Sequence, residues 1–370
     1  MAYFADWAPR EDIDFSRFDW IDYAFDVVSQ DSSLNWDDAM NGSKQLQKLV
    51  ADAHGGGTKV KLSIGGWTGS KDFSTAVSTP EKRQTFANNV EKLYKDYNLD
   101  GIDIDWEYPG QSGDGANGVS PNDTQNMLSF FKLLREALPP TARITAAVQD
   151  QPFAGADGQP IHDASGFAEV LDWVLMMDYD TYETTTPPGP NAPLYNGCGK
   201  SREPSQNAAA GVNAWTAAGF PANKLVLGVP SYGYITKSSE TTLQARSLPP
   251  TRHSPRRLSR RNTALPEDDS GQIQFRSLVR QGILVQGGDG SFVGSGGFER
   301  GWDSCSATPF LHNPQSGQLI PYDDPQSLAL KAAFVRKMGM AGVNLFDIHG
   351  DTDAWDLTDS LRKNLVVPAV

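Results

Sequence analysis

Residues 101–109 read Gly-Ile-Asp-Ile-Asp-Trp-Glu-Tyr-Pro, in which acidic and large apolar side chains alternate strictly. The acids occupy positions 103, 105 and 107, and the apolar residues occupy 102, 104 and 106. A two-residue period is that of a β-strand, so one face of the strand is apolar and the other carries three carboxyl groups. At roughly 3.3 Å per residue these groups lie within about 14 Å of one another.

The rest of the chain alternates short apolar runs with segments of helical period. Strands are predicted at 3–7, 20–27, 59–64, 101–107, 143–148, 173–177, 225–229 and 342–346. Helices are predicted at 43–54, 80–97, 126–138, 167–171, 206–218, 326–338 and 354–363. About eight repeats of strand and helix favour an α/β fold of the (β/α)8 TIM-barrel type over an open parallel sheet.

A barrel gives the acidic strand a function. The inward face of a barrel strand leads to the active-site mouth, while its other face packs on the helices. Ile102, Ile104 and Trp106 should therefore face the helices, and Asp103, Asp105 and Glu107 should line the interior. Repulsion and burial raise the pKa of at least one such carboxyl group, which can then donate a proton near neutral pH. We set aside a salt-bridged or metal-binding strand, because the strand carries no Lys or Arg.

One region interrupts the barrel pattern. We assign 1–233 and 321–370 to the barrel and 234–320 to a small α+β insertion between its seventh and eighth strands. Within the insertion, 246–262 is rich in Arg and Pro, and residues 246–261 contain no acid. We expect this arm to be a disordered surface loop, with a docking patch for an acidic polymer as the alternative.

Composition limits the partners and the compartment. A formal charge of −13 argues against nucleic acid and anionic membranes as partners, and no apolar run is long enough to span a bilayer. Cys198 and Cys305 lie in turn-rich sequence, which favours one disulfide between two loops over two free thiols. Glycosylation sequons at Asn41 and Asn122 fit a secreted monomer, although the chain itself begins with a predicted strand and shows no signal peptide.

Four segments together resemble a known family. Residues 100–107, Asp-Gly-Ile-Asp-Ile-Asp-Trp-Glu, resemble the DGxDxDxE signature of family 18 glycoside hydrolases, the chitinases and their relatives. Ser63-Ile-Gly-Gly66, Met177-Asp-Tyr-Asp180 and the opening Tyr3-Phe4 with Trp7 resemble three further motifs of that family, in the same order. The resemblance covers residues 2–362 and is strongest to fungal members.

The resemblance implies a substrate-assisted, retaining mechanism, which needs neither metal nor cofactor. The 2-acetamido carbonyl of the sugar would attack the anomeric carbon while Glu107 protonates the leaving oxygen. Asp105 would bind the acetamide N–H, and Asp103 would lie below it and share its proton. Tyr179 would donate its hydroxyl to the acetamide oxygen. The further substrate-binding residues implied in the same way are Tyr3, Trp67, Tyr108, Met177, Asp180, Tyr232 and Phe346.

Several positions differ from what the resemblance leads us to expect. These departures are Gln149, Asp150 and Gln151 after the fifth strand, Asp178 within the Met177–Asp180 motif of the sixth strand, and Tyr182 and Glu183 after that motif. Phe346 also stands where many members have Trp. Added carboxyl groups can shift the titration of the acidic stack or obstruct a subsite.

Two functions therefore remain open. The first is a chitinase that cleaves β-1,4-linked N-acetylglucosamine polymers internally. The alternative is a weakened or inactive chitinase-like protein that binds and sequesters chitin oligosaccharides. An endo-acetylglucosaminidase acting on N-glycans is less favoured. A further run of possible metal ligands, 347–353, is better explained as a loop that caps the last helix.

Overall fold

The computed structural model describes residues 1–182, 188–199, 201, 203–238, 240–243 and 271–365. These residues form two compact units. The first contains Met1–Met176 and Asn213–Val226, and the second contains Met177–Val212 and the described residues from Leu227 onward. Glu183 and the Arg-rich arm 246–262 lie outside the described residues.

The predicted (β/α)8 barrel is confirmed. Its sheet has the strand order β1-β17-β8-β7-β6-β5-β4-β2-β3, and an added β1–β2 pairing closes the ring, with β3 outside it. The strands are β1 (Ala2–Ala5), β2 (Trp20–Val28), β3 (Leu34–Trp36), β4 (Lys59–Gly65), β5 (Gly101–Asp105), β6 (Arg143–Val148), β7 (Trp173–Met176), β8 (Leu225–Pro230) and β17 (Gly342–Phe346).

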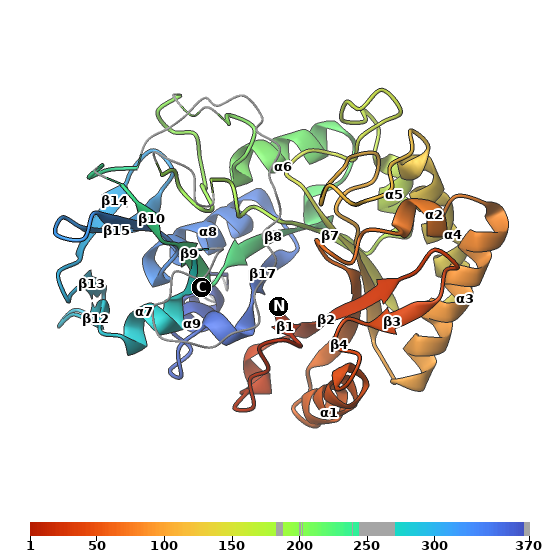
Figure 1. The fold of residues 1–370 in the computed structure, drawn as a ribbon, viewed down its shortest axis with the longest axis horizontal. Helices are drawn as coiled ribbons and strands as arrows, with labels where there is room; N and C mark the ends of the chain where they lie inside the picture. The colour runs from red at the N-terminus through yellow and green to blue at the C-terminus, as the bar shows by residue number, and fades with distance from the viewer. Residues whose placement is uncertain (183–187, 200, 202, 239, 244–270, 366–370) are drawn as a thin grey trace. The chain divides into compact units, whose positions relative to one another are not determined.

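Helices cover the strands of the first unit, and Figure 1 shows α3 and α4 side by side outside them. Two aromatic stacks fill the space between: Trp106 lies 5.1 Å from Phe73, and Phe86 lies 4.3 Å from Phe130, each centroid to centroid. Trp106 therefore faces the helices as the alternation predicts. The helices are α1 (Gly42–Gly55), α2 (Phe73–Ala76), α3 (Pro80–Asp96), α4 (Asp123–Ala137) and α5 (Ser165–Val170), with short 3-10 turns η1 (Phe15–Arg17) and η2 (Ala222–Lys224). The helix α6 (Ala208–Ala217) has its first residues, to Val212, assigned to the second unit and the others to the first.

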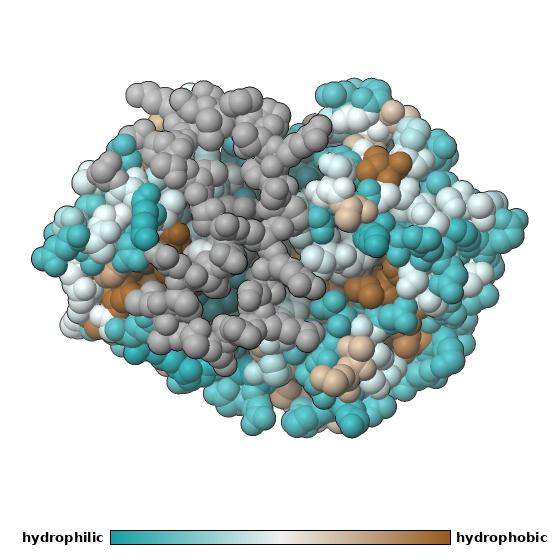
Figure 2. Space-filling view, viewed as in Figure 1, coloured by the Kyte–Doolittle hydropathy of each residue, from teal (hydrophilic) through white to brown (hydrophobic). Residues whose placement is uncertain are grey.

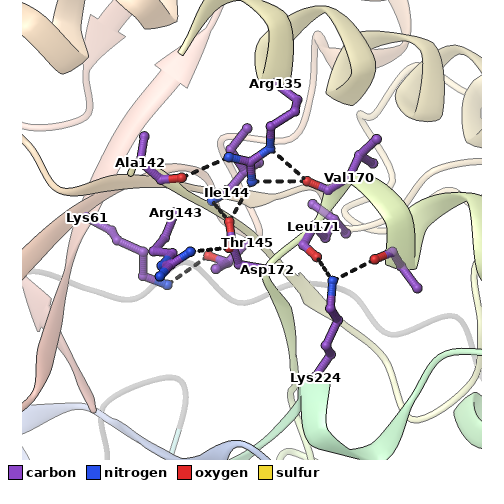
Figure 3. Close-up of polar contacts among 11 residues, drawn as sticks. Lys61, Arg135, Ala142, Arg143, Ile144, Thr145, Val170, Leu171, Asp172 and Lys224 are labelled. Atoms are coloured by element: carbon purple, nitrogen blue, oxygen red, sulfur yellow. Dashed lines mark hydrogen bonds and ion pairs between the residues drawn. The ribbon is translucent and has the colours of Figure 1, made fainter. Parts of the chain in front are cut away.

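A polar cluster ties α4 to the starts of β6 and β7 (Figure 3). The Asp172 carboxylate accepts from Arg135 at 2.5 Å, from Arg143 at 2.8 Å and from the Ile144 backbone N–H at 2.8 Å. In the same view Lys224 donates to two carbonyl oxygens at the end of α5, where a cation complements the helix dipole. These contacts fix the strand register at the end of the barrel where the strands begin.

The second unit carries the predicted insertion, which is confirmed between β8 and β17, the seventh and eighth barrel strands. It holds a four-stranded sheet of order β10-β16-β15-β14 and the pairs β11–β9 and β12–β13. The elements are β9 (Tyr232–Tyr234), β10 (Thr236–Lys237), β11 (Gln272–Gln274), α7 (Phe275–Arg280), β12 (Leu284–Gln286), β13 (Phe292–Gly294), β14 (Glu299–Asp303), β15 (Thr308–Asn313) and β16 (Gln318–Pro321).

Two helices and a disulfide complete this unit. The helices α8 (Pro325–Met338) and α9 (Asp356–Leu365) lie side by side, with a 3-10 turn η3 (Ile348–Gly350) before α9 (Figure 1). An Asp324–Ser327 capping box begins α8, and Gly339, at φ 66°, ends it. Cys198 and Cys305 form a disulfide with their Cα atoms 5.1 Å apart.

The coloured part of the face drawn in Figure 2 is mainly hydrophilic or intermediate, with separate apolar patches. Among the described residues, few large apolar side chains are well exposed; Met40, at 80%, is the most exposed of these. No helix in the described part of the chain has both the length and the apolar character needed to cross a membrane.

Candidate functional site

The acids of the opening stretch lie where β5 ends. The strand stops at Asp105, two residues earlier than predicted, so Glu107 lies just beyond it. Asp103 and Asp105 are 1% and 3% exposed, whereas Glu107 is partly exposed. Two carboxyl groups are therefore buried, and the third is the one that solvent or substrate can reach.

Three hydroxyl groups hold Asp103 from three other strands. Tyr3 of β1 and Ser63 of β4 donate to its Oδ2 at 3.0 and 2.8 Å. Thr145 of β6 donates to its Oδ1 at 2.5 Å. The parallel register places Ser63 and Thr145 directly beside Asp103 on the neighbouring strands. Tyr3 is itself 1% exposed, so its hydrogen bond to this carboxylate is buried.

Asp105 is the acid that burial affects most clearly. Burial raises its pKa well above the ordinary value of 3.8, and the negative charges of Glu107 and Asp103 raise it further. Among the described residues, its Oδ1 has no hydrogen-bond partner. A buried carboxyl group without such a partner is most stable when it keeps its proton. The protonated Asp105 can thus donate a hydrogen bond to a neighbouring polar group.

The backbone of Glu107 is fixed on both sides. Its N–H donates to Ser70 Oγ at 2.8 Å, and its carbonyl accepts from Asn117 Nδ2 at 2.8 Å. The glycines of the Ser63–Gly66 motif allow β4 to approach this turn closely. A Cβ on Gly65, at φ 119°, would lie 2.1 Å from the Asp105 carbonyl oxygen, and the Gly66 N–H donates to the same oxygen at 2.8 Å.

Sequence reasoning missed one charged residue of this site. Lys61 of β4 is 1% exposed, and its Nζ lies 3.2 Å from Asp22 Oδ1 and 4.0 Å from Asp103 Oδ1. The absence of Lys and Arg from the acidic strand was our reason for setting a salt bridge aside. That inference was wrong, because the cation comes from the next strand. The alternation Lys59-Val-Lys61-Leu reads as a half-exposed strand, and only the closed barrel buries Lys61.

Flat aromatic faces accompany the acids in the first unit. Trp67, after β4, and Tyr108, after Glu107, are both partly exposed, and their ring centroids lie 6.4 Å apart at 70°. Such faces suit the apolar sides of sugar rings. Both residues were predicted to bind substrate.

A second group of predicted residues gathers in the second unit. The Tyr179 ring stacks on Phe346 at 5.7 Å, and Tyr232 meets Tyr179 edge-on at 6.3 Å. Asp180 accepts from the hydroxyls of Tyr232 at 2.6 Å and Tyr234 at 2.9 Å. Tyr234 was not predicted, although it alternates with Tyr232 along β9. Met177, the first residue of the Met177–Asp180 motif, is partly exposed.

The sequence departures differ in their surroundings. Gln149 is anchored, because its carbonyl accepts from Trp215 Nε1 at 2.9 Å and its side chain from Gln111 at 3.2 Å. Gln149 and Gln151 also line a cavity of about 10 Å³, with Trp106 and Tyr108 among its other walls. Such a volume is about that of one water molecule.

Asp150 is the most unusual departure. It is 8% exposed, and burial raises its pKa to about 7. Its Oδ1 has no hydrogen-bond partner in the part of the chain that the structure describes. By contrast, Tyr182 is 5% exposed and packs its ring on Gly189, with its hydroxyl 3.1 Å from Ser201 Oγ. Asp178 is 1% exposed.

The remaining candidate for metal binding is a structural loop. Asp351 accepts from the Leu357 and Thr358 backbone N–H groups at 2.9 and 2.8 Å, at the start of α9. Asp347 accepts from the His349 N–H at 2.7 Å. Within the described ranges, no three His, Cys, Asp or Glu side chains are grouped to hold a metal ion.

Comparison with known proteins gives consistent matches along the chain. The family described as glycosyl hydrolases family 18 matches residues 1–351. A chitinase-like effector of Moniliophthora roreri is 36% identical over 95% of this chain and 89% of its own length. A chitinase-like effector of Moniliophthora perniciosa is 30% identical over 92% of this chain and 80% of its own. The crystal structure of a chitinase from Rhizomucor miehei superposes with a TM-score of 0.84 at 32% identity, and covers 98% of both chains.

Proposed function

Because the chain belongs to the family 18 glycosyl hydrolases, we propose that it is a chitinase that cleaves β-1,4-linked N-acetylglucosamine polymers internally. The observation that carries the proposal is the acidic stack at the end of β5. An ionisable, partly exposed Glu107 stands beyond a buried Asp105 with a raised pKa, which in turn stands beyond the hydrogen-bonded Asp103. A second accessible carboxylate is not required where the substrate supplies its own nucleophile.

Each residue then has one task. Glu107 protonates the leaving glycosidic oxygen, and afterwards, as a carboxylate, it activates the incoming water. Asp105 accepts from the acetamide N–H through its carbonyl oxygen, and the single negative charge of the Asp103–Asp105 pair balances the positive charge of the oxazolinium ion. Tyr179, held by Phe346 and Tyr232, donates to the acetamide oxygen and keeps it in line with the anomeric carbon. Trp67 and Tyr108 provide faces on which sugar rings stack.

We propose chitin oligosaccharides as the partner and the extracellular space as the compartment. The acidic chain favours a neutral or cationic ligand over a polyanion. The Cys198–Cys305 disulfide supports an oxidising compartment. Both sequon residues, Asn41 and Asn122, are exposed and accessible to glycosylation. The protein is proposed to act as a monomer.

A second candidate function is supported by Asp150 and by the Moniliophthora relatives. Asp150 lies beyond β6, next to the acidic strand, and its Oδ1 has no hydrogen-bond partner among the described residues. Its buried carboxyl adds a titrating group that the reaction does not need. The proteins at 36% and 30% identity are described as chitinase-like effectors. In this candidate the chain keeps the sugar-binding groove, hydrolyses poorly or not at all, and sequesters chitin oligosaccharides.

Turnover separates the two functions. Hydrolysis of the N-acetylglucosamine hexamer should be followed beside a calorimetric titration of the same oligomer with the same sample. Cleavage to dimer and trimer supports the chitinase, whereas tight binding without product over hours supports sequestration. Replacement of Gln149–Gln151 by apolar residues should raise a weak rate if these residues are its cause, and should leave the rate unchanged if they are neutral.

A further inference from the structure

A fixed positive charge lies below the acidic stack. Lys61, Asp22 and Asp103 each have side chains that are 1% exposed, and the lysine contacts both acids, as given above. Its ring contact is with Trp173, whose centroid lies 4.7 Å from Nζ. Burying an ammonium group is costly unless opposite charges compensate it, and here two carboxylates do so.

The direction of the hydrogen bonds assigns the charge on Asp103. A lysine ammonium group has only donors, so Thr145 Oγ1 accepts from Lys61 Nζ at 2.7 Å (Figure 3). The single hydroxyl proton of Thr145 is then directed at Asp103. Tyr3 and Ser63 also donate to Asp103, so each of its hydrogen bonds in the described structure is one that a carboxylate accepts. Three of the roughly four acceptor positions of the carboxylate are therefore occupied, and a proton on Asp103 would have to take the one that is left.

The next acid in the stack has the opposite surroundings. Asp105 Oδ1 receives no donor among the described residues, and its pKa is raised by burial and by the negative charges of Glu107 and Asp103. If two neighbouring carboxyl groups hold one proton between them, the proton rests on the group with fewer donors. That group is Asp105.

We propose that Lys61 is a positioning residue of the reaction: acting directly and through Thr145, it holds Asp103 as an anion, keeps the proton of the acidic pair on Asp105, and thereby sets the pH range of the site. This inference rests on the proposed chitinase function. It narrows the expectation that Asp103 and Asp105 share a proton, because it assigns the proton to one of them. The ionisable groups that face the pair in the first unit are Tyr3 from β1, Asp22 from β2, Lys61 from β4 and Glu107 beyond β5.

Two substitutions with opposite signs test the electrostatic part. In Lys61→Met a positive charge is lost, so every nearby carboxyl group is protonated more readily. Both the acidic and the basic limb of the plot of kcat/KM against pH should therefore move to higher pH by about one unit. In Asp22→Asn a negative charge is lost while the lysine stays, and both limbs should move to lower pH. Lys61→Arg keeps the charge and should restore the wild-type limbs.

A purely structural lysine would behave differently. Lys61→Met and Asp22→Asn would then lose catalytic rate or stability without moving the limbs of the pH profile in opposite directions. This result would overturn the proposal. Thermal unfolding of each variant shows whether it is folded. If Lys61→Met does not fold, the Asp22→Asn shift and the following measurement decide the question.

Infrared spectroscopy locates the proton without any turnover. The band of protonated carboxyl groups should be recorded at about pH 6 for the wild type, Asp105→Asn and Asp103→Asn. Relative to the wild type, the band should weaken in Asp105→Asn and persist in Asp103→Asn. Buried carboxyl groups such as Asp26 and Asp150 contribute to the band in every variant, so a weaker band in Asp103→Asn but not in Asp105→Asn would contradict the inference. If chitin oligomers are not cleaved at all, the proposed function fails, while the infrared difference still shows whether Asp105 holds the proton.

Discussion

The hydroxyl of Tyr3 donates to Asp103 Oδ2 at 3.0 Å and so connects the first strand of the barrel to the acidic strand 100 residues later. Both side chains are 1% exposed. The bond therefore acts in the low-dielectric interior, where a hydrogen bond to a charged group stabilises more than one at the surface. The opening residues of the chain thus take part directly in holding the acidic stack.

Tyr3→Phe should lower the free energy of unfolding at neutral pH by about 1–3 kcal/mol, because a buried carboxylate loses a donor. Tyr23→Phe is the matched control, since the Tyr23 side chain is equally buried but its hydroxyl donates at 3.0 Å to the neutral Gly42 carbonyl. Tyr23→Phe should lower the free energy of unfolding by about 1 kcal/mol. Urea unfolding of both variants measures the difference, and equal losses would mean that the charge of Asp103 is unimportant.

Tyr179→Phe should lower kcat by roughly 100- to 1000-fold, as expected when one donor to a developing charge is removed. Its ring contacts with Phe346 and Tyr232 would remain, so binding of the hexamer should change little. Tyr182→Phe serves as the control, because that hydroxyl contacts Ser201 in a buried position. A rate for Tyr179→Phe equal to the control would remove Tyr179 from the mechanism.

Asp26→Asn should stabilise the protein at alkaline pH. Asp26 is 1% exposed, its Oδ1 has no partner among the described residues, and burial raises its pKa to about 7. Between about pH 4 and pH 7 the folded protein keeps a proton on Asp26 that the unfolded chain releases, so stability falls as the pH rises through this range.

The free energy of unfolding of Asp26→Asn should exceed that of the wild type by about 2–4 kcal/mol at pH 8, and the difference should be close to zero below pH 4. Chemical unfolding at the two pH values measures it. Asp14→Asn is the control, because the carboxyl of Asp14 is exposed and hydrogen-bonded to Ser16. An equal effect of Asp26→Asn at both pH values would show that the residue does not titrate in this range.

Replacing Cys198 and Cys305 by Ser should lower the free energy of unfolding by about 4–5 kcal/mol, since the bridge closes a loop with a sequence separation of 107 residues. Two backbone hydrogen bonds, from Gly197 to Cys305 and from Leu194 to Ser306, already connect the same segments. The folded structure should therefore survive. Denaturant unfolding of the double variant measures the loss, and free thiols found in the oxidised wild type would contradict the pairing.

Much of the fold follows from local pattern. The alternation of residues 101–107 predicts which side chains face inward, and the Trp106–Phe73 stack on the helix side agrees with it. Helix limits follow from capping residues such as Thr79, whose hydroxyl accepts from the Lys82 N–H. The same alternation predicted a strand that is two residues too long. The turn that carries Glu107 depends on hydrogen bonds to Ser70, 37 residues earlier, and to Asn117, 10 residues later.

The contents of the site were harder to predict. Lys61 looks like any surface lysine of a half-exposed strand, and only the parallel register beside Asp22 and Gly101 places it inside the barrel. Tyr182 looked like a change in the groove, but Gly189 leaves room for its ring to be buried. Contacts of this kind depend on strand order and closure, and a single sequence contains neither.

In the proposed mechanism Glu107 donates a proton to the glycosidic oxygen. Glu107→Gln should be tested against the wild type for hydrolysis of the N-acetylglucosamine hexamer and, by calorimetry, for binding of the same oligomer. The account predicts that hydrolysis is lost while the binding constant stays within a few-fold of the wild type, since Gln keeps the shape of the side chain but has no acidic proton. An unchanged rate of hydrolysis in Glu107→Gln would contradict it.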